Sequence, residues 1–444
     1  MPPSLYLSPV AEPTAGLLNG QDTPIPRVLV AESSRWACGH RIAIALAQAG
    51  CEVAAVCPQS DHPLLKTHAV GRISRYSPIN PLDSLLAAIE ATNPQIIIPC
   101  DDLAVIHLHE LHARALKSKE SAGFVADVIE RSLGSPEGYS IVSSRDKLLE
   151  IARDEGILTP LTGQLRTVDD LKRWQMDHAL PWVLKIDRTW GGRGVRIVNT
   201  ADEAQQLFHE MTHLFGDLRA AKKLIVNRDP IWIRPAWNRC PPAITVQRYV
   251  YGRAANCGVV SWRGQILAGI AVEAIDTQGR TGPASVVRVL DNPTMLLCAE
   301  QIARRLNLSG FFGLDFVIEE DSGLAYLIEM NPRCTPVCHL QLGKGRDLIE
   351  ALCAQLFGRP VHESPSVTTN ELIAYFPQAW LSGSKHLEAS YQDIPKGEPE
   401  LIQMLLKPAL PHGRRSASFH YVLLLVDRLR RIACRVLPKD RTVT

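Results

Sequence analysis

The first part of the chain alternates short apolar runs with one amphipathic segment. RVLVAES predicts a buried strand, GHRIAIALAQAG predicts a helix that ends at Gly50, and CEVAAVCP predicts a second strand. PQIIIPCDD predicts a further strand. This strand–helix–strand order is typical of a parallel, Rossmann-like α/β sheet. The first turn, ESSRWACGH, lacks the G-x-G-x-x-G pattern, so the sequence does not support dinucleotide binding.

Polar side chains follow two of these predicted strands. Ser33 and Ser34 come after the first strand, and Asp101 and Asp102 come after PQIIIPC. Ligands bind α/β sheets at the carboxyl ends of strands, so these residues are candidates for substrate contact. The alternative, which we favour, is that they cap helices and face solvent in loops.

Two later segments place a lysine in an unusual position. Ser144–Gly156 predicts a helix with Ser144 as its cap, yet Lys147 occupies the first turn, where the helix dipole favours an acid. There it serves either as a surface residue or as part of an anion site. Pro181–Thr200 predicts two strands around the loop DRTWGGRG, in which Gly191, Gly192 and Gly194 let backbone amides approach a polyanion. Lys185 lies within the first of these strands, where burial requires a charged partner.

The segment Phe311–Pro336 carries the strongest pattern, with two apolar runs around Asp321-Ser322-Gly323. It predicts a β-hairpin with a three-residue loop, in which Glu320 faces Leu324 and Asp315 lies opposite Glu329. Alternation along the strands then places Asp315, Glu329 and Asn331 on one face. Oxygen ligands of this kind suit Mg²⁺. The alternative from these residues alone is the solvated face of an ordinary hairpin.

FFG, LDF and EMNPR in this hairpin resemble the metal-binding end of the ATP-grasp superfamily, whose members use ATP to activate a carboxylate as an acyl phosphate. The resemblance extends in order over about 27–360. It implies Mg²⁺, or Mn²⁺, on Asp315, Glu329 and Asn331. It also implies Arg333 as a phosphate or transition-state contact. From the other matched segments it implies ATP contacts by Lys147, Lys185 and the glycine loop.

ITVQRYVYG, at Ile244–Gly252, predicts an edge strand that resembles the adenine-binding hinge of the same superfamily. Gln247 replaces the usual acid there, which puts its side-chain contact in doubt and leaves backbone recognition by Arg248 and Val250. An ordinary strand is the alternative. Arg280 or Arg288, in RTGPASVVRV, is a candidate for binding a substrate carboxylate, although surface arginines fit equally well.

Composition narrows the classes of partner. The chain has 444 residues, 46% of them hydrophobic, and 48 basic against 46 acidic residues give a net charge of +2. Such a balance disfavours nucleic acid, and no apolar run reaches the length of a membrane span. Eleven cysteines without a CxxC pair fit reduced, mostly buried thiols of a cytoplasmic protein. HLHELH, at His107–His112, lacks HExxH spacing and predicts a partly exposed helix face, and Cys334, Cys338 and His339 predict packing rather than a soft-metal site.

The predicted fold class is α/β: a Rossmann-like N-terminal domain, a two-lobed α+β ATP-grasp domain and a small C-terminal extension. The expected boundaries are a disordered lead-in at 1–26, the first domain at 27–135, the catalytic domain at 136–360 and an extension of unassigned role at 361–444. The implied activity is an ATP-dependent ligase that joins a small-molecule carboxylate to an amine. A biotin-carboxylase-like enzyme, a kinase and a non-catalytic nucleotide-binding module stay open as alternatives, and a homo-oligomer is compatible with each.

Overall fold

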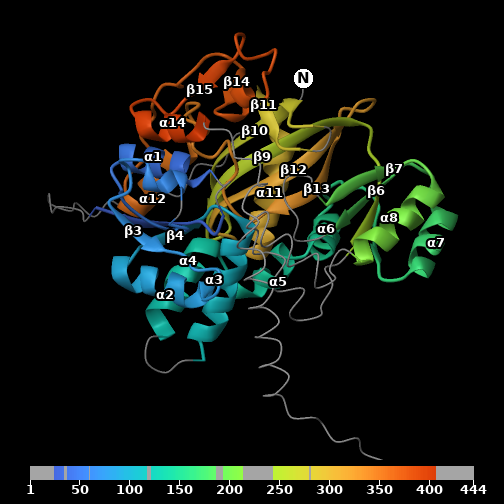
Figure 1. The fold of residues 1–444 in the computed structure, drawn as a ribbon, viewed down its shortest axis with the longest axis horizontal. Coiled ribbons are helices and arrows are strands. Elements are labelled where there is room, and N and C mark those ends of the chain that lie inside the picture. Colours follow the sequence, from blue (N-terminus) through green and yellow to red (C-terminus); the bar gives the residue numbers. More distant parts are fainter. Residues whose placement is uncertain are drawn as a thin grey trace, which may run out of the picture.

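The computed structural model shows three β-sheets among the residues it describes, with the largest in the centre (Figure 1). It describes residues 25–34, 38–59, 61–117, 122–186, 194–213, 244–279 and 282–406. Gly191, Gly192, Arg280, the segment 217–242 and the residues beyond 406 therefore lie outside the described part of the chain. No helix within the described ranges is long and apolar enough to cross a membrane.

The N-terminal sheet is parallel, with strand order β3-β2-β1-β4, as the strand–helix–strand pattern predicts. Alternate residues of β1 face opposite layers: Val28 and Val30 pack toward α1 and the central sheet, and Leu29 packs toward α2, α3 and α4. The bounds are β1 Arg27–Ala31, α1 Gly39–Gln48, β2 Glu52–Cys57, β3 Arg72–Arg75, α2 Pro81–Thr92, β4 Ile96–Pro99, α3 Asp102–Ala115 and α4 Ala122–Leu133.

The central sheet has seven strands in the order β13-β12-β9-β10-β11-β14-β15. Its one face packs on α6 and α11, and its other face packs on α1, α12 and the parallel sheet. The bounds are β9 Gly252–Trp262, β10 Gln265–Thr277, β11 Ala284–Leu290, β12 Gly310–Glu319, β13 Ala325–Asn331, β14 Leu372–Tyr375, β15 Tyr391–Asp393, α6 Arg145–Asp154, α11 Pro293–Leu306 and α12 Leu348–Phe357.

The third sheet, with order β5-β8-β6-β7, lies at the opposite side of the molecule from the parallel sheet (Figure 1). Helices α7 and α8 cover it through a core that includes Trp182 and Phe208. The bounds are β5 Thr162–Leu165, α7 Val168–Asp177, β6 Trp182–Ile186, β7 Val195–Val198, α8 Ala201–His213 and β8 Ile244–Arg248. The remaining short helices are α5 Tyr139–Val142, α13 Gln378–Leu381 and α14 Pro399–Leu406, with 3₁₀ turns at Pro63–Leu65 and Pro136–Gly138.

Several sequence-based predictions of detail are wrong. Strand β8 is not an edge strand, because β5, which the sequence did not predict, pairs with it on the side away from β6. Ser144 occupies the cap position of α6 without making a side-chain cap.

The loop of the metal-site hairpin also differs from prediction. The Glu319 N–H donates to Leu324 O at 2.9 Å, so the loop has four residues and Glu319, not Glu320, faces Leu324. Gly323 adopts the positive φ, 70°, that the loop needs. A β-bulge between Asp315 and Phe316 shifts the register by one residue, and Asp315 lies opposite Glu329 as predicted.

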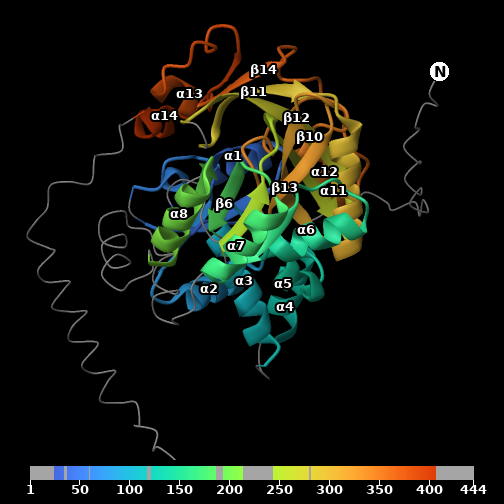
Figure 2. The ribbon, with the colours of Figure 1, turned by 90° about the vertical axis from the view of Figure 1, so that its right-hand side faces the viewer.

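The chain beyond residue 361 extends the central sheet. Strand β14 pairs with β11, with Val287 opposite Ile373, and β15 pairs with β14. Figure 2 shows β11 and β14 side by side at one end of that sheet. The C-terminal segment is therefore continuous with the sheet that carries the hairpin.

Candidate active site

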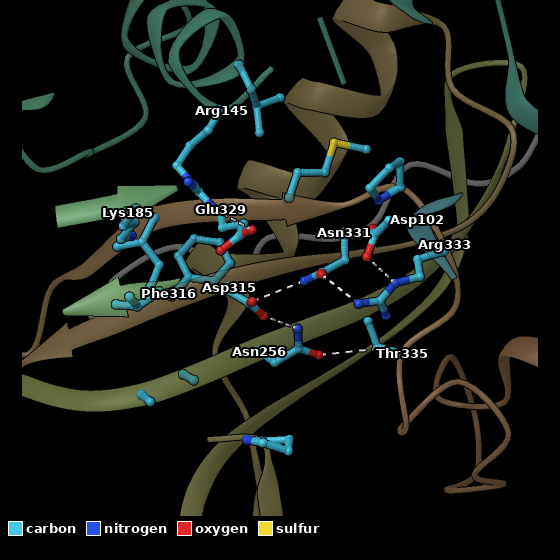
Figure 3. Close-up of a pocket in the computed structure, with 18 of the residues that line it drawn as sticks. Asp102, Arg145, Lys185, Asn256, Asp315, Phe316, Glu329, Asn331, Arg333 and Thr335 are labelled. Carbon is cyan, nitrogen blue, oxygen red and sulfur yellow. Dashed lines mark hydrogen bonds and ion pairs between the residues drawn. The ribbon is translucent and has the colours of Figure 1, made fainter. Parts of the chain in front are cut away.

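A cavity of about 750 Å³ lies between the central sheet, the β5–β8 sheet and helix α3 (Figure 3). Residues of β6, β8, β9, β10, β11, β12, β13 and β14 line it, together with the start of α6. The central sheet and the β5–β8 sheet thus border the cavity directly, and the parallel sheet borders it through α3, the helix that follows β4.

Asp315 is held by two amides at the centre of the cavity floor. Asn256 Nδ2 donates to Asp315 Oδ1 at 2.6 Å, and Asn331 Nδ2 donates to Asp315 Oδ2 at 3.0 Å (Figure 3). Burial, followed by the neighbouring Glu329 charge, raises the pKa of Asp315, although both amide hydrogen bonds oppose this. The arrangement gathers carboxylate and amide oxygens on one face, as the strand alternation predicts.

Glu329 is neutralised by cations from two other elements. Arg145, at the start of α6, lies with Nη2 2.8 Å from Glu329 Oε1, and Lys185 of β6 lies beside it (Figure 3). Both cations are buried, Lys185 to 4% exposure. Burial acts to raise the pKa of Glu329, but the charges of Arg145 and Lys185 outweigh it and hold that pKa below its usual value. The buried lysine predicted to need a charged partner therefore lies near one.

Arg333 connects the hairpin to the parallel sheet. Its Nη2 donates to Asn331 Oδ1 at 3.1 Å, and its Nε donates to Asp102 Oδ2 at 3.2 Å. Burial acts to lower the pKa of Arg333, and the Asp102 carboxylate more than compensates and raises it. Asp102 begins α3, directly after β4, so the carboxyl end of the parallel sheet contributes to the site.

Asp101 caps α3, as we favoured, whereas Ser33 and Ser34 cap no helix that the structure describes and donate hydrogen bonds to Asp101. Asp101 Oδ1 accepts from the Ala104 N–H at 2.8 Å at the start of α3 and from the Ser33 hydroxyl at 2.6 Å. The Ser34 N–H also donates to Asp101. Of the four candidates, Asp102 alone is among the residues that line the cavity.

Two glycines allow the segment after Arg333 to approach the sheet closely. A Cβ at Gly313 would lie 2.3 Å from Thr335 Cγ2, and one at Gly258 would lie 2.4 Å from Val337 Cγ2. Any side chain at these positions would push the segment off the sheet. Thr335 is also anchored through a hydrogen bond to Asn256 Oδ1 at 3.4 Å. This packing fixes the backbone that carries Arg333.

The predicted nucleotide contacts fall into two groups. Lys185, Gln247, Arg248 and Val250 line the cavity, whereas Lys147 is exposed and does not. From that helix the structure brings Arg145 to the carboxylates instead. Gly194 is buried and directly precedes β7, but it is not among the lining residues.

The hinge strand presents backbone rather than side-chain groups. Gln247 Nε2 donates to Thr162 Oγ1 at 3.0 Å, so its amide is occupied by β5. The Arg248 N–H donates to Leu161 O at 2.9 Å. Among the described residues, no hydrogen-bond acceptor contacts the Val250 N–H, which leaves that donor for a ligand.

The donor set fits a hard cation. Within the described ranges no cluster of three or more His, Cys, Asp or Glu side chains could hold a metal. The set here has two carboxylates and one amide, and each carboxylate retains acceptor capacity beyond its hydrogen bonds. Asp315, Glu329 and Asn331 therefore suit Mg²⁺ bound jointly with phosphate oxygens.

Among the described residues, the histidines and cysteines do not gather into a group that could hold a metal. His107 and His112 are buried, not partly exposed, and Tyr76 and Glu130 hydrogen-bond to their rings at 2.9 and 2.7 Å. His109 borders the cavity and stacks on Tyr139. The described cysteines are all free, and all but Cys38 are buried.

The two arginine candidates for substrate recognition are not at the cavity. Arg280 lies outside the described residues. Arg288 extends from the face of β11 opposite to cavity-lining Val287 and pairs with Glu273 at 2.7 Å.

Comparison with known proteins shows which family this region resembles. A family model described as an ATP-grasp domain matches residues 233–337, which include Asn256, the hairpin and Arg333. Residues 233–337 are thus similar to an ATP-grasp domain. The large chain of carbamoyl phosphate synthase from Thermoanaerobacter pseudethanolicus is 24% identical over 208 residues, 45% of this chain and 17% of that relative. The match thus covers only a fraction of that relative's length.

Solved structures agree on the fold. The biotin carboxylase domain of Hydrogenobacter thermophilus 2-oxoglutarate carboxylase, determined with MgADP and bicarbonate, has a TM-score of 0.53 at 17% identity and covers 76% of this chain and 71% of that one. An L-amino acid ligase from Bacillus licheniformis has a TM-score of 0.52 at 13% identity, covering 77% and 75%. At such identities the likeness concerns the fold.

The sequence analysis did not identify Arg145 or Asn256 as site residues, and it favoured a structural role for Asp102 over substrate contact. Asn256 had a visible signal, since it is a lone amide in the apolar run AANCGVV. Pairing of β9 with β12 places it directly opposite Asp315. Arg145 had none, because its neighbour Lys147 carries the same charge on the same helical turn.

Proposed function

We propose that this ATP-grasp protein is a ligase that uses Mg-ATP to activate a carboxylate as an acyl phosphate and transfers the acyl group to an amine or amino acid. The observation that carries the proposal is the convergence of Glu329, Asp315 and Asn331 with the buried cations Arg145 and Lys185 in one cavity. Burying a cation costs desolvation free energy unless the cation pairs with an anion, and a triphosphate is the anion that the superfamily binds.

The acidic and amide side chains would bind the metal, and the cationic side chains would bind the phosphates. Asp315, Glu329 and Asn331 would hold Mg²⁺, or Mn²⁺, which when bound neutralises phosphate oxygens. Lys185 and Arg145 would bind the α- and β-phosphates, and the glycine loop with Gly191, Gly192 and Gly194 would cover them. The contact of Lys147 with ATP stays a prediction. The free Val250 N–H and the Arg248 backbone would recognise adenine, with Gln247 supporting the strand.

The reaction would consist of two displacements. A carboxylate oxygen attacks the γ-phosphorus and ADP leaves, and the amine nitrogen then attacks the acyl carbon, releasing phosphate and a proton. Arg333, oriented by Asp102 and Asn331, would neutralise the charge that develops on the transferred phosphoryl group. Positioning and charge neutralisation would supply most of the rate enhancement.

The domain organisation proposed for this reaction assigns the parallel sheet to the first domain and leaves β14 and β15 of the central sheet in the C-terminal extension. Residues 27–135 would form a Rossmann-like domain, 136–360 the nucleotide-binding domain and 361–444 an extension. The Asp102–Arg333 contact supports a role for the first of these in catalysis. The L-amino acid ligase among the structural neighbours supports an amine or amino acid as nucleophile.

The test is release of ADP from Mg-ATP in the presence of pooled carboxylates, with and without pooled amines and amino acids, and separately with bicarbonate. Turnover that requires both a carboxylate and an amine supports the ligase. Bicarbonate-dependent turnover would indicate biotin-carboxylase-like chemistry, and amine-independent phosphorylation would indicate a kinase. ATP binding without turnover under every condition would contradict an enzymatic role.

A further inference from the structure

One end of the cavity contains a tyrosine hydroxyl that has no partner among the described residues. Tyr375, the last residue of β14, lines the cavity and is 5% exposed. Its hydroxyl makes no hydrogen bond to any residue that the structure describes. Its position at the cavity wall makes a bound ligand the natural acceptor.

The wall between the hairpin and Tyr375 is apolar. Val272, Ala274 and Val287 line it from β10 and β11, which are the next strands beyond β9 in the sheet. Val272 lies opposite Asn256, and Ala274 lies opposite Val287, so these side chains continue the face that carries Asp315. Val337 adds a further apolar side chain.

The charged residues of the same strands point away from this wall. Glu273 lies between Val272 and Ala274 in the sequence and therefore on the other face, where Arg253 and Arg288 pair with it at 3.1 and 2.7 Å. A charged substrate group placed against the wall would find no counter-charge on β10 or β11. It would lose hydration without compensation.

We propose that this wall and Tyr375 select the carboxylate substrate, a step that rests on the ligase function proposed above. The substrate is a carboxylic acid with an apolar chain that lies on Val272, Ala274 and Val287. The chain ends in a hydrogen-bond acceptor, such as a carbonyl oxygen, that takes the Tyr375 proton. Its carboxylate reaches the phosphoryl group at the Arg333 end.

Two further observations support this assignment. Burial, and next the Asp393 charge, raise the pKa of Tyr375 well above its usual value, so the hydroxyl stays a donor at neutral pH. Strand β14 also lies after the family-matched segment, which ends at residue 337. The selecting residue thus comes from the part of the chain that differs from the shared catalytic segment.

The experiment traps the acyl phosphate with hydroxylamine, which replaces the unidentified amine and gives a hydroxamate, ADP and phosphate. Three acids of matched length are compared: a straight-chain fatty acid, the monomethyl ester of a dicarboxylic acid, which carries a distal carbonyl, and a polar acid such as glutamate. The wild-type protein should have the lowest KM for the ester, a higher KM for the fatty acid and the highest for glutamate.

Tyr375→Phe removes only the hydroxyl. It should raise KM for the ester about 3–10-fold, the effect of one neutral hydrogen bond, with kcat and the KM for the fatty acid unchanged. Ala274→Leu narrows the wall and should raise KM for both apolar acids. Tyr391→Phe is the matched control, because Tyr391 belongs to neighbouring β15 and is not among the lining residues; it should change none of these values.

Failure of the substrate assignment can be distinguished from failure of the proposed function, because the ATP affinity of the same proteins is measured by calorimetry. A preference for glutamate, an equal effect of Tyr375→Phe on both apolar acids, or ATP binding without conversion of any of the three acids would overturn the substrate assignment. Failure to bind ATP would instead contradict the nucleotide site itself.

Discussion

Two glutamates in the central sheet each lie between two cations, and the pattern of burial differs between them. Glu273 is 2% exposed, and its partners Arg253 and Arg288 are 62% and 42% exposed. Glu329 is 30% exposed, and its partner Arg145 is only 6% exposed. At Glu273 the arginines extend into solvent, so the charges of this cluster are satisfied by one another and by water. At Glu329 the cations are the buried members and face a cavity.

The comparison shows which ion pairs indicate a site. A buried carboxylate under exposed arginines needs no ligand, because water solvates the cations. Buried cations beside a partly accessible carboxylate instead place charged groups at the surface of a cavity. There the cations can bind a polyanion and the carboxylate can bind a hard cation. Sequence alone does not separate the two cases, since both glutamates lie in apolar strands.

The largest expected effect is from Glu329→Gln, which keeps the size of the side chain and removes its charge. We expect turnover to fall by about 100-fold or more while ATP still binds, because a cation that neutralises phosphoryl charge loses its anionic ligand. ADP release as a function of Mg²⁺ concentration measures this. Wild-type turnover at limiting Mg²⁺ would remove Glu329 from the metal site.

Next in size is Lys185→Ala, which removes a buried cation from the cavity. Charge-assisted hydrogen bonds contribute about 1.5–3 kcal/mol, so the Kd for ATP should rise about 10–100-fold. Calorimetric titration gives the value, and circular dichroism checks that the variant is folded. A folded variant with unchanged affinity would mean that the triphosphate binds elsewhere.

Glu273→Gln tests the other member of the comparison. The two arginines lose their counter-charge but remain hydrated, so the free energy of unfolding should fall by about 1 kcal/mol or less. ATP affinity should be unchanged. Urea unfolding and ATP titration provide the two measurements, and a loss of ATP affinity in a stable variant would show that this cluster also serves the cavity.

The smallest effect is expected for Glu320→Gln, in the loop of the same hairpin as Glu329. Glu320 is exposed and makes no side-chain hydrogen bond to the described residues. Turnover and unfolding should therefore match the wild type within error. A clear loss of turnover would mean that the hairpin responds to charge at any position, which would weaken the interpretation of Glu329→Gln.

The sequence predicted the parallel sheet and the opposition of Asp315 and Glu329, because both depend on local periodicity. It did not predict that a bulge would supply this opposition, since the loop length near Gly323 is set by backbone hydrogen bonds. The Asp102–Arg333 contact joins residues 231 positions apart and depends on how two sheets dock. Arg145 rather than Lys147 reaches Glu329 because of the direction from which α6 packs on β13. The periodicity of the sequence does not predict that direction.

The pairing of β14 with β11 has a consequence for the order in which the molecule is assembled. Ile373 pairs with Val287 across a long stretch of sequence, so the wall at Tyr375 closes only after the ribosome has released the strand that completes it. Until then the hairpin, the parallel sheet and the β5–β8 sheet can fold with the cavity open on that side. A nascent chain would then acquire the groups that bind nucleotide before those that select the acid.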